Sequence, residues 1–282
     1  MTPFRPSISG RHTATLIDNK SYILGGINLS GEMVKDFFYL DVSAPFSTQE
    51  LLWQNLTNNN MVPPHHSATS AGGGANNDTL FLFGGITSDQ TMALVYTFDS
   101  RNGKFYLWGG AYMDFVFSNE MLILDTINLN WKKGSLLNAP TPRHRYGATL
   151  LPNNKIIYIG GNNDNTTVHD IQTSNIVKGT ALTLSEVYIY DMINDNWDIK
   201  ITSGKIPSNR GGVSTILGLD GQKVIIYRGF FINPGYLDTT LYVLDLTNYN
   251  WYVPKISGIV PKPRDFYQAN VIGKYMVISF EI

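Results

Sequence analysis

The clearest indication of the fold is the sequence Ile156-Ile-Tyr-Ile-Gly160-Gly161, which is followed by Val187-Tyr-Ile-Tyr-Asp191 and by Trp197. Both apolar runs are short, rich in β-branched and aromatic residues, and bounded by turn-forming Gly, Asn or Asp, which is typical of β-strands. No part of the sequence keeps a period of 3.6 residues over a useful length. The sequence therefore predicts an all-β protein.

The same arrangement recurs along the chain. Each repeat begins with an Ala/Ser-Thr strand opened by Arg or His (strand A). An apolar strand ending in Gly-Gly (B), a strand ending in Asp (C) and a Trp on the last strand (D) follow. The glycine pairs or their counterparts are Gly25-Gly26, Gly84-Gly85, Gly109-Gly110, Gly160-Gly161 and Arg228-Gly229. The first residue of each pair precedes the Asp by 16, 15, 16, 31 and 17 residues, a regularity that indicates structural repeats.

Two regions are incomplete. Repeat 2 ends at Tyr96-Thr-Phe-Asp99 without a Trp, and repeat 3 starts abruptly at Phe105 without a strand A. A sixth repeat opens at Arg264 and supplies only strands A and B. The repeats occupy approximately residues 8–62, 63–104, 105–139, 140–206, 207–260 and 261–282.

Double glycines and spaced aromatic residues in units of about 50 residues resemble the kelch-repeat β-propellers of the galactose-oxidase/kelch superfamily. The resemblance covers essentially the whole chain and implies that each repeat is one blade of four antiparallel strands. We therefore expect a single domain over residues 1–282 with five to six blades, one incomplete blade region and a truncated last blade.

Composition excludes several classes of function. The formal net charge is −1 and only 15% of residues are charged, so the chain lacks the basic field of a nucleic-acid or membrane-binding protein. No signal peptide or transmembrane stretch is evident, which gives a cytoplasmic expectation by default, although a full-length parent could be anchored in a membrane.

If the chain were an enzyme, the resemblance would imply a copper radical oxidase. Galactose-oxidase-type kelch proteins use a tyrosine cross-linked to a cysteine, and this chain has no Cys. His12 and His66 align with Tyr146, Gly212 and Tyr267, which is typical of a packing position rather than of a metal ligand. We therefore expect no catalytic residue, no metal and no cofactor.

One end of the repeats is the candidate binding face. Antiparallel strands place the B–C loops and the starts of the A strands at the same end. This end is predicted to carry Arg143, Arg145, Arg210, Arg228 and Arg264, and also the long B–C loop of repeat 4 with Asn163, Asp164 and His169. Long loops on a rigid scaffold are common recognition sites, whereas strand-A arginines can equally bind the neighbouring blade.

The sequence favours a non-enzymatic protein-interaction scaffold that uses this loop face. Its partner would be a protein, with an acidic or phosphorylated segment as the candidate ligand for the arginines. An alternative is a galactose-oxidase-like or carbohydrate-active enzyme relative that retains only its propeller. A third hypothesis is that the chain is a structural or degenerate ectodomain.

Overall fold

The computed structural model describes residues 4–7, 9–59, 62–73, 79–88, 104–110, 116–125, 128, 130–170, 172–234, 241–258 and 268–279. Strands form the regular structure of this part apart from one short 3-10 helix, η1 (Thr57–Asn59), which confirms the all-β prediction. No helix among these residues is long and apolar enough to cross a bilayer. Two compact bodies are distinguished: body 1 contains Met1–Tyr106, Ile123–Lys132 and Tyr267–Ile282, and body 2 contains Leu107–Leu122 and Lys133–Phe266.

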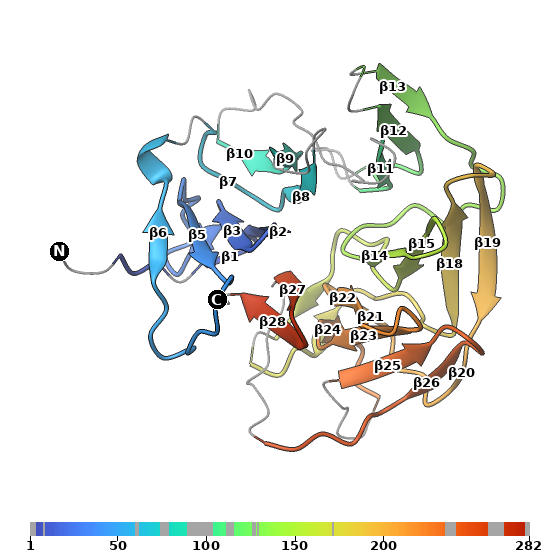
Figure 1. Ribbon diagram of the computed structural model, residues 1–282. Coiled ribbons are helices and arrows are strands. Elements are labelled where there is room, and N and C mark those ends of the chain that lie inside the picture. Colours follow the sequence, from blue (N-terminus) through green and yellow to red (C-terminus); the bar gives the residue numbers. More distant parts are fainter. Residues whose placement is uncertain are drawn as a thin grey trace. The chain divides into compact units, whose positions relative to one another are not determined.

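Three repeats form complete antiparallel sheets in the predicted order A, B, C, D (Figure 1). Repeat 1 contains β2 (Thr13–Ile17), β3 (Lys20–Leu24), β5 (Phe37–Asp41) and β6 (Trp53–Asn55). Repeat 4 contains β14 (Gly147–Leu151), β15 (Lys155–Ile159), β18 (Glu186–Asp191) and β19 (Asn196–Ile201). Repeat 5 contains β22 (Ser214–Leu217), β23 (Lys223–Tyr227), β25 (Leu241–Asp245) and β26 (Asn250–Tyr252), and β20 (Ser203–Gly204) adds a parallel strand beside β26.

The other repeats have smaller sheets in the described part of the chain. Repeat 2 has β8 (Thr69–Gly73) and β9 (Thr79–Phe83), and its predicted strand C at Tyr96–Asp99 lies outside the described residues. Repeat 3 has β11 (Lys104–Trp108), β12 (Met121–Asp125) and β13 (Asn130–Lys133). Repeat 6 has β27 (Gln268–Ile272) and β28 (Tyr275–Ser279).

Short strand pairs join the start of strand A to the end of strand B. They are β1 (Ser9–Gly10) with β4 (Ile27–Asn28), β7 (His65–His66) with β10 (Ile86–Thr87), and β21 (Arg210–Gly211) with β24 (Phe230–Phe231). An isolated bridge between His144 and Asn162 takes the same place in repeat 4. In repeats 1, 2, 4 and 5, these pairs place the start of strand A and the beginning of the B–C loop at one end of the repeat.

The predicted turn after strand C is present. In repeat 4 the Asp191 carboxylate accepts hydrogen bonds from the backbone N–H groups of Ile193 (2.9 Å) and Asn194 (3.0 Å). Asp245 accepts in the same way from Thr247 in repeat 5. An Asp at this point ends the strand because its side chain takes up amides that would otherwise continue the sheet.

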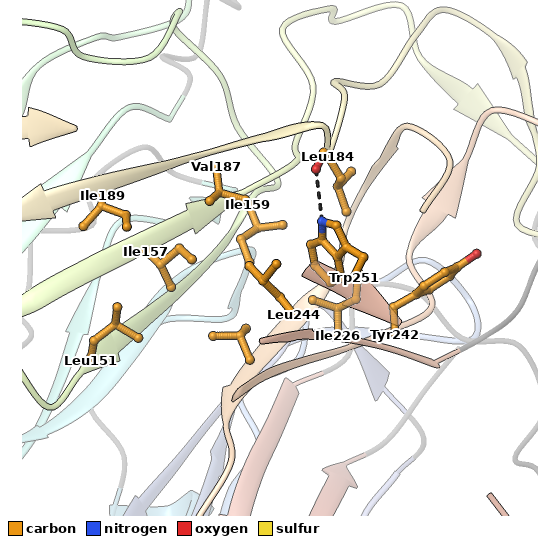
Figure 2. Packing of buried hydrophobic residues seen from close by; sticks show 11 residues of the cluster. Leu151, Ile157, Ile159, Leu184, Val187, Ile189, Ile226, Tyr242, Leu244 and Trp251 are labelled. Atoms are coloured by element: carbon orange, nitrogen blue, oxygen red, sulfur yellow. Dashed lines mark hydrogen bonds between the residues drawn. The ribbon is translucent and has the colours of Figure 1, made fainter. Parts of the chain in front are cut away.

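A hydrophobic core lies between the sheets of repeats 4 and 5 (Figure 2). Ile157 and Ile226, from the two B strands, are both fully buried. The indole N–H of Trp251 donates to the carbonyl oxygen of Leu184 at 3.1 Å, so this large side chain is buried without an unpaired polar atom. Burying one such apolar side chain contributes about 1.5–3 kcal/mol.

Within each body, the A strands of successive repeats lie side by side. Thr149 on β14 donates a hydrogen bond to Thr215 on β22 at 2.7 Å, and Thr15 on β2 makes the equivalent contact with Ser70 on β8. On the other side of β2, Asn270 of β27 donates to the carbonyl of Ala14 at 3.3 Å. Repeat 6 therefore packs directly against repeat 1.

Candidate functional site

The double glycine is the point at which one repeat meets the next. Gly160 has a φ of +63°, and a Cβ there would lie 2.6 Å from the carbonyl oxygen of Arg210 in repeat 5. The N–H of Gly161 donates to this same carbonyl at 3.0 Å. Gly25 meets His65, and Gly109 meets Arg143, in the same way. A side chain is excluded at this contact because the backbone of the next repeat fills its place.

Arg143 and Arg210 occupy the position that receives this contact. In Arg210, Nε donates to the Ser208 carbonyl (3.0 Å), Nη1 to the Arg228 carbonyl (3.3 Å) and Nη2 to the Ser208 hydroxyl (2.9 Å). Arg143 repeats this pattern with Thr141 and the Gly160 carbonyl. In both repeats a Ser or Thr two residues before the arginine supplies two of the three acceptors.

Both guanidinium groups are also stacked on strand C. Arg143 lies 4.9 Å from the ring of Tyr188, and Arg210 lies 5.0 Å from the equivalent Tyr242. Burial lowers the pKa of Arg143, and Arg210 is 0% exposed. These contacts join strands within each repeat, so they give Arg143 and Arg210 a structural role, and only 5% and 0% of the two residues is exposed.

Arg145 and Arg228 are placed differently. Both are half-buried and both have left-handed backbones, with φ of 54° and 48°. Glycine stands at the equivalent of Arg145 in repeat 5 (Gly212), and at the equivalent of Arg228 in four repeats. A residue with a Cβ costs about 1–2 kcal/mol in this conformation. The Arg145 guanidinium lies 5.7 Å from the Phe230 ring.

The long B–C loop of repeat 4 forms a hairpin of β16 (Val168–His169) and β17 (Ile176–Lys178). At its base, the Asp164 carboxylate accepts hydrogen bonds from the hydroxyl and the N–H of Thr166, which lower the pKa of Asp164. Asn163 beside it is exposed, whereas Asn162 is fully buried and donates to the Asp164 carbonyl at 2.7 Å. The loop is thus organised by its own hydrogen bonds.

The hairpin is fixed to repeat 5. His169 stacks on Phe230 with ring centroids 5.0 Å apart and planes 15° from parallel. The N–H of Phe231 donates to the Ser174 carbonyl at 2.9 Å, and Asn175 forms a parallel bridge with Phe231. His169 is therefore a packing residue that holds the hairpin, a role that the sequence did not indicate because Phe230 lies 61 residues further on (230 − 169).

Apolar side chains remain exposed around this docked hairpin. Val168 is 52% exposed, Val177 67% and Ile232, next to β24, 37%. We call these three residues, with Arg145, Asn163 and Arg228, the hairpin surface. It contains three of the eight binding residues predicted from the sequence. Asp164 and His169 support it, Arg143 and Arg210 are buried, and Arg264 lies outside the described residues.

The position of His12 corrects one detail of the sequence alignment. Strand pairing aligns Thr13 with Thr69, Gly147 and Ser214. The residues equivalent to His12 are therefore Ala68 in repeat 2, Tyr146 in repeat 4 and Val213 in repeat 5. The sequence alignment had placed His66 and Gly212 there in repeats 2 and 5. The sequence alignment was wrong because it matched the Ala-Thr pairs. In the structure, strand A begins two residues after a residue with a left-handed backbone (Arg11, Ser67, Arg145 or Gly212).

His12 itself joins repeat 1 to repeat 6. Its Nδ1 donates to the Ser9 carbonyl (3.2 Å), because a carbonyl can only accept, and its Nε2 lies 3.1 Å from the Ser279 hydroxyl oxygen. Burial lowers the pKa of His12 to about 4, so the ring is neutral near pH 7. Among the described residues, no three His, Asp or Glu side chains gather closely enough to hold a metal ion.

Comparisons with known proteins agree with this geometry. A family model described as the KLHDC2/KLHL20/DRC7 Kelch-repeats domain matches residues 174–279. Human host cell factor 1 is 27% identical over 196 residues, 65% of this chain and 9% of that protein. The solved structure of YjhT has a TM-score of 0.63 at 14% identity and covers 98% of this chain and 91% of that one. The chain is a kelch-repeat β-propeller.

A second relative of this chain is human kelch domain-containing protein 3, which is 31% identical over 101 residues, 33% of this chain and 26% of that protein. The aligned part of this chain spans less than a tenth of the length of host cell factor 1 and about a quarter of the length of kelch domain-containing protein 3. The likeness to YjhT establishes the fold alone. The predicted five to six blades are compatible with the sheets of the six repeats.

Proposed function

We propose that this kelch propeller is a non-enzymatic protein-binding domain and that its partner contacts the hairpin surface. The observation that carries the proposal is the docked hairpin: stacking on Phe230 and backbone pairing to Phe231 hold it, while Val168 and Val177 stay exposed. A rigid loop loses little conformational entropy when it binds, and exposed apolar residues rimmed by polar ones are typical of protein interfaces.

The partner is a polypeptide with an acidic or phosphorylated segment. Arg145 lies over the ring of Phe230, on which His169 of the hairpin also stacks, and Arg228 precedes Phe230 by two residues in the sequence. Guanidinium groups bind carboxylates and phosphates through paired charge-assisted hydrogen bonds. Six repeats in one domain over residues 1–282 would supply the rigid support.

Affinity purification of partners tests the apolar part of the surface. The double variant Val168→Ser/Val177→Ser removes apolar area without disturbing the His169–Phe230 stack and is expected to lose the partners that the parent chain retains. Leu219→Ser is the matched control, because Leu219 is also exposed (71%) but follows β22 at the other end of the repeat. Equal recovery of partners by the double variant and the parent would refute the proposal.

Glycine substitutions test whether Arg145 and Arg228 bind the partner. Arg145→Gly and Arg228→Gly introduce residues that other repeats carry at these positions, so the fold is expected to keep or gain about 1 kcal/mol of stability. Loss of a charge-assisted pair should weaken binding of a purified partner about 10-fold or more for each variant. Unchanged affinity, or affinity insensitive to salt, would exclude an acidic or phosphorylated ligand at the arginines.

A further inference from the structure

The hairpin in the B–C loop of repeat 4 contains a β-bulge. His169 of β16 pairs with Ile176 of β17, but Val168 pairs with Lys178 rather than with Val177. Val177 is therefore an extra residue, and Val177 and Lys178 together lie opposite Val168. Bulges change the direction of nearby side chains and are common beside functional sites.

The two faces of this hairpin have different surroundings. His169 lies on the face directed at repeat 5, because its ring stacks on Phe230. Successive residues of a strand point to opposite faces, and residues paired across two strands share a face. Val168 and its partner Lys178 therefore lie on the face directed away from repeat 5. Their exposure agrees with this, since Val168 is 52% exposed, Val177 67%, and Lys178 is exposed as well.

The bulge determines which side chains this second face presents. In a regular hairpin that kept the pair His169–Ile176, Val168 would pair with Val177, and Lys178 would point to the same side as Ile176. The extra residue instead brings Lys178 onto the face of the two valines. We call Val168, Val177 and Lys178 the outward face of the hairpin.

The charge of the outward face is available to a partner. No ion pair joins Lys178 to any residue in the part of the chain that the structure describes. The carboxylates of the hairpin are taken up in its own turns. Asp164 accepts hydrogen bonds from the N–H (2.6 Å) and hydroxyl (2.7 Å) of Thr166, and Asp170 from those of Thr173 (2.8 and 3.0 Å). The outward face thus presents an ammonium group beside two valines.

We propose that the outward face binds a linear segment of the partner in which an apolar side chain lies next to an Asp or Glu. The apolar side chain packs against Val168 and Val177, and the carboxylate pairs with the ammonium group of Lys178. Apolar contact supplies affinity, while the complementary charge selects among partners. Lys178 is then a specificity-determining residue. The inference rests on the proposed function, because it names what the hairpin surface recognises.

The probe is a phage-displayed library of short random peptides, selected on the intact immobilised chain. The parent chain is expected to enrich peptides with an aliphatic or aromatic residue beside Asp or Glu. The variant Lys178→Glu should keep the apolar preference but enrich Lys or Arg in place of the acid, because the charge of the face is reversed. Lys205→Glu is the matched control: Lys205 is also exposed but follows β20, so this variant should enrich the same peptides as the parent.

Titration of a synthetic peptide with the enriched sequence tests the residues one at a time. Lys178→Glu should weaken its binding about 10-fold or more. Deletion of Val177 converts the hairpin to a regular one that keeps the pair Val168–Lys178, and it should also weaken binding, because one of the two valines is lost. Thermal unfolding of each variant checks that the domain remains folded.

Three results would overturn the proposal. They are no enrichment of any peptide by the parent chain, enrichment of the same acidic peptides by Lys178→Glu, and equal affinity of the synthetic peptide for Lys178→Glu and the parent. The two levels of inference fail separately. If partners need Val168 and Val177 but are bound equally by Lys178→Glu, only the role of Lys178 is wrong, whereas partner binding that survives Val168→Ser/Val177→Ser refutes the proposed function itself.

Discussion

At the scale of single residues, the end of strand B shows how closely two repeats approach. Gly160 and Gly84 have the same φ of +63°, yet a Cβ at Gly160 would lie 2.6 Å from a backbone carbonyl, and a Cβ at Gly84 would meet no described atom within 4 Å. The two positions therefore separate the cost of the backbone conformation from the cost of the close approach.

Gly84→Ala is expected to lower the free energy of unfolding by about 1 kcal/mol through its left-handed φ alone. Gly160→Ala adds a steric clash with the carbonyl of Arg210 and should cost roughly 2–4 kcal/mol. Urea unfolding of both variants measures the difference. Equal losses would mean that the glycine pair does not mark the contact between repeats.

His12 makes stability depend on pH. Its pKa is 6.5 in the unfolded chain and about 4 in the folded protein, so the unfolded state binds the proton more readily. The sign follows from this difference: the contribution is complete above pH 6.5 and is lost as the pH falls towards 4. Burial also lowers the pKa values of His65, His66 and His144, which act in the same direction.

Unfolding measured between pH 7.5 and 4.5 should therefore show a loss of stability, of which about 2.5 kcal/mol comes from His12. The variant His12→Asn should reduce the slope by up to about 1.4 kcal/mol per pH unit near pH 5. A slope identical to that of the parent would show that His12 is not buried as described.

At the scale of strands and turns, much of the fold is predictable from local chemistry. Glycine pairs, strand-ending Asp residues and the flank Trp follow from φ, turn capping and amphipathic packing, and the complete repeats have them as predicted. The start of strand A was misplaced in repeats 2 and 5, because a left-handed backbone at Ser67 and Gly212 leaves no distinctive residue type.

The candidate site was less predictable than the fold. The arginines were recognised as a group, but the sequence does not show that Arg143 and Arg210 bind backbone carbonyls and tyrosine rings while Arg145 and Arg228 are only half-buried. A Ser or Thr two residues earlier, at Thr141 and Ser208, is the one local signal that separates the buried pair. The docking of the hairpin on Phe230 depends on a contact distant in sequence.

Trp251 tests the anchoring of one repeat on the next. Trp251→Phe removes the hydrogen bond to Leu184 and leaves space in the core of Figure 2, so it should cost about 2 kcal/mol or more. Trp131→Phe is the matched control: Trp131 is 40% exposed, and its replacement should cost well under 1 kcal/mol. Thermal unfolding compares the two, and a larger loss for Trp131→Phe would contradict this description of the core.

At the scale of the whole molecule, the account depends on neighbouring A strands lying side by side within each of the two bodies. The hydroxyl pairs Thr149–Thr215 and Thr15–Ser70 record this arrangement at equivalent positions in the two bodies. Each pair is separated by more than 50 residues of sequence (215 − 149 = 66 and 70 − 15 = 55), so no local structure would bring its members together.

The chain has no cysteine, so a single introduced pair reports directly on this contact. Thr149→Cys/Thr215→Cys places two thiols where the hydroxyls are 2.7 Å apart, close enough for a disulfide after small adjustment. The decisive measurement is mass spectrometry of the double variant after mild oxidation under native conditions. The account predicts an intramolecular disulfide between positions 149 and 215 that forms in the folded chain and not in urea. Two thiols that stay free and react with alkylating reagents in the folded chain would contradict it.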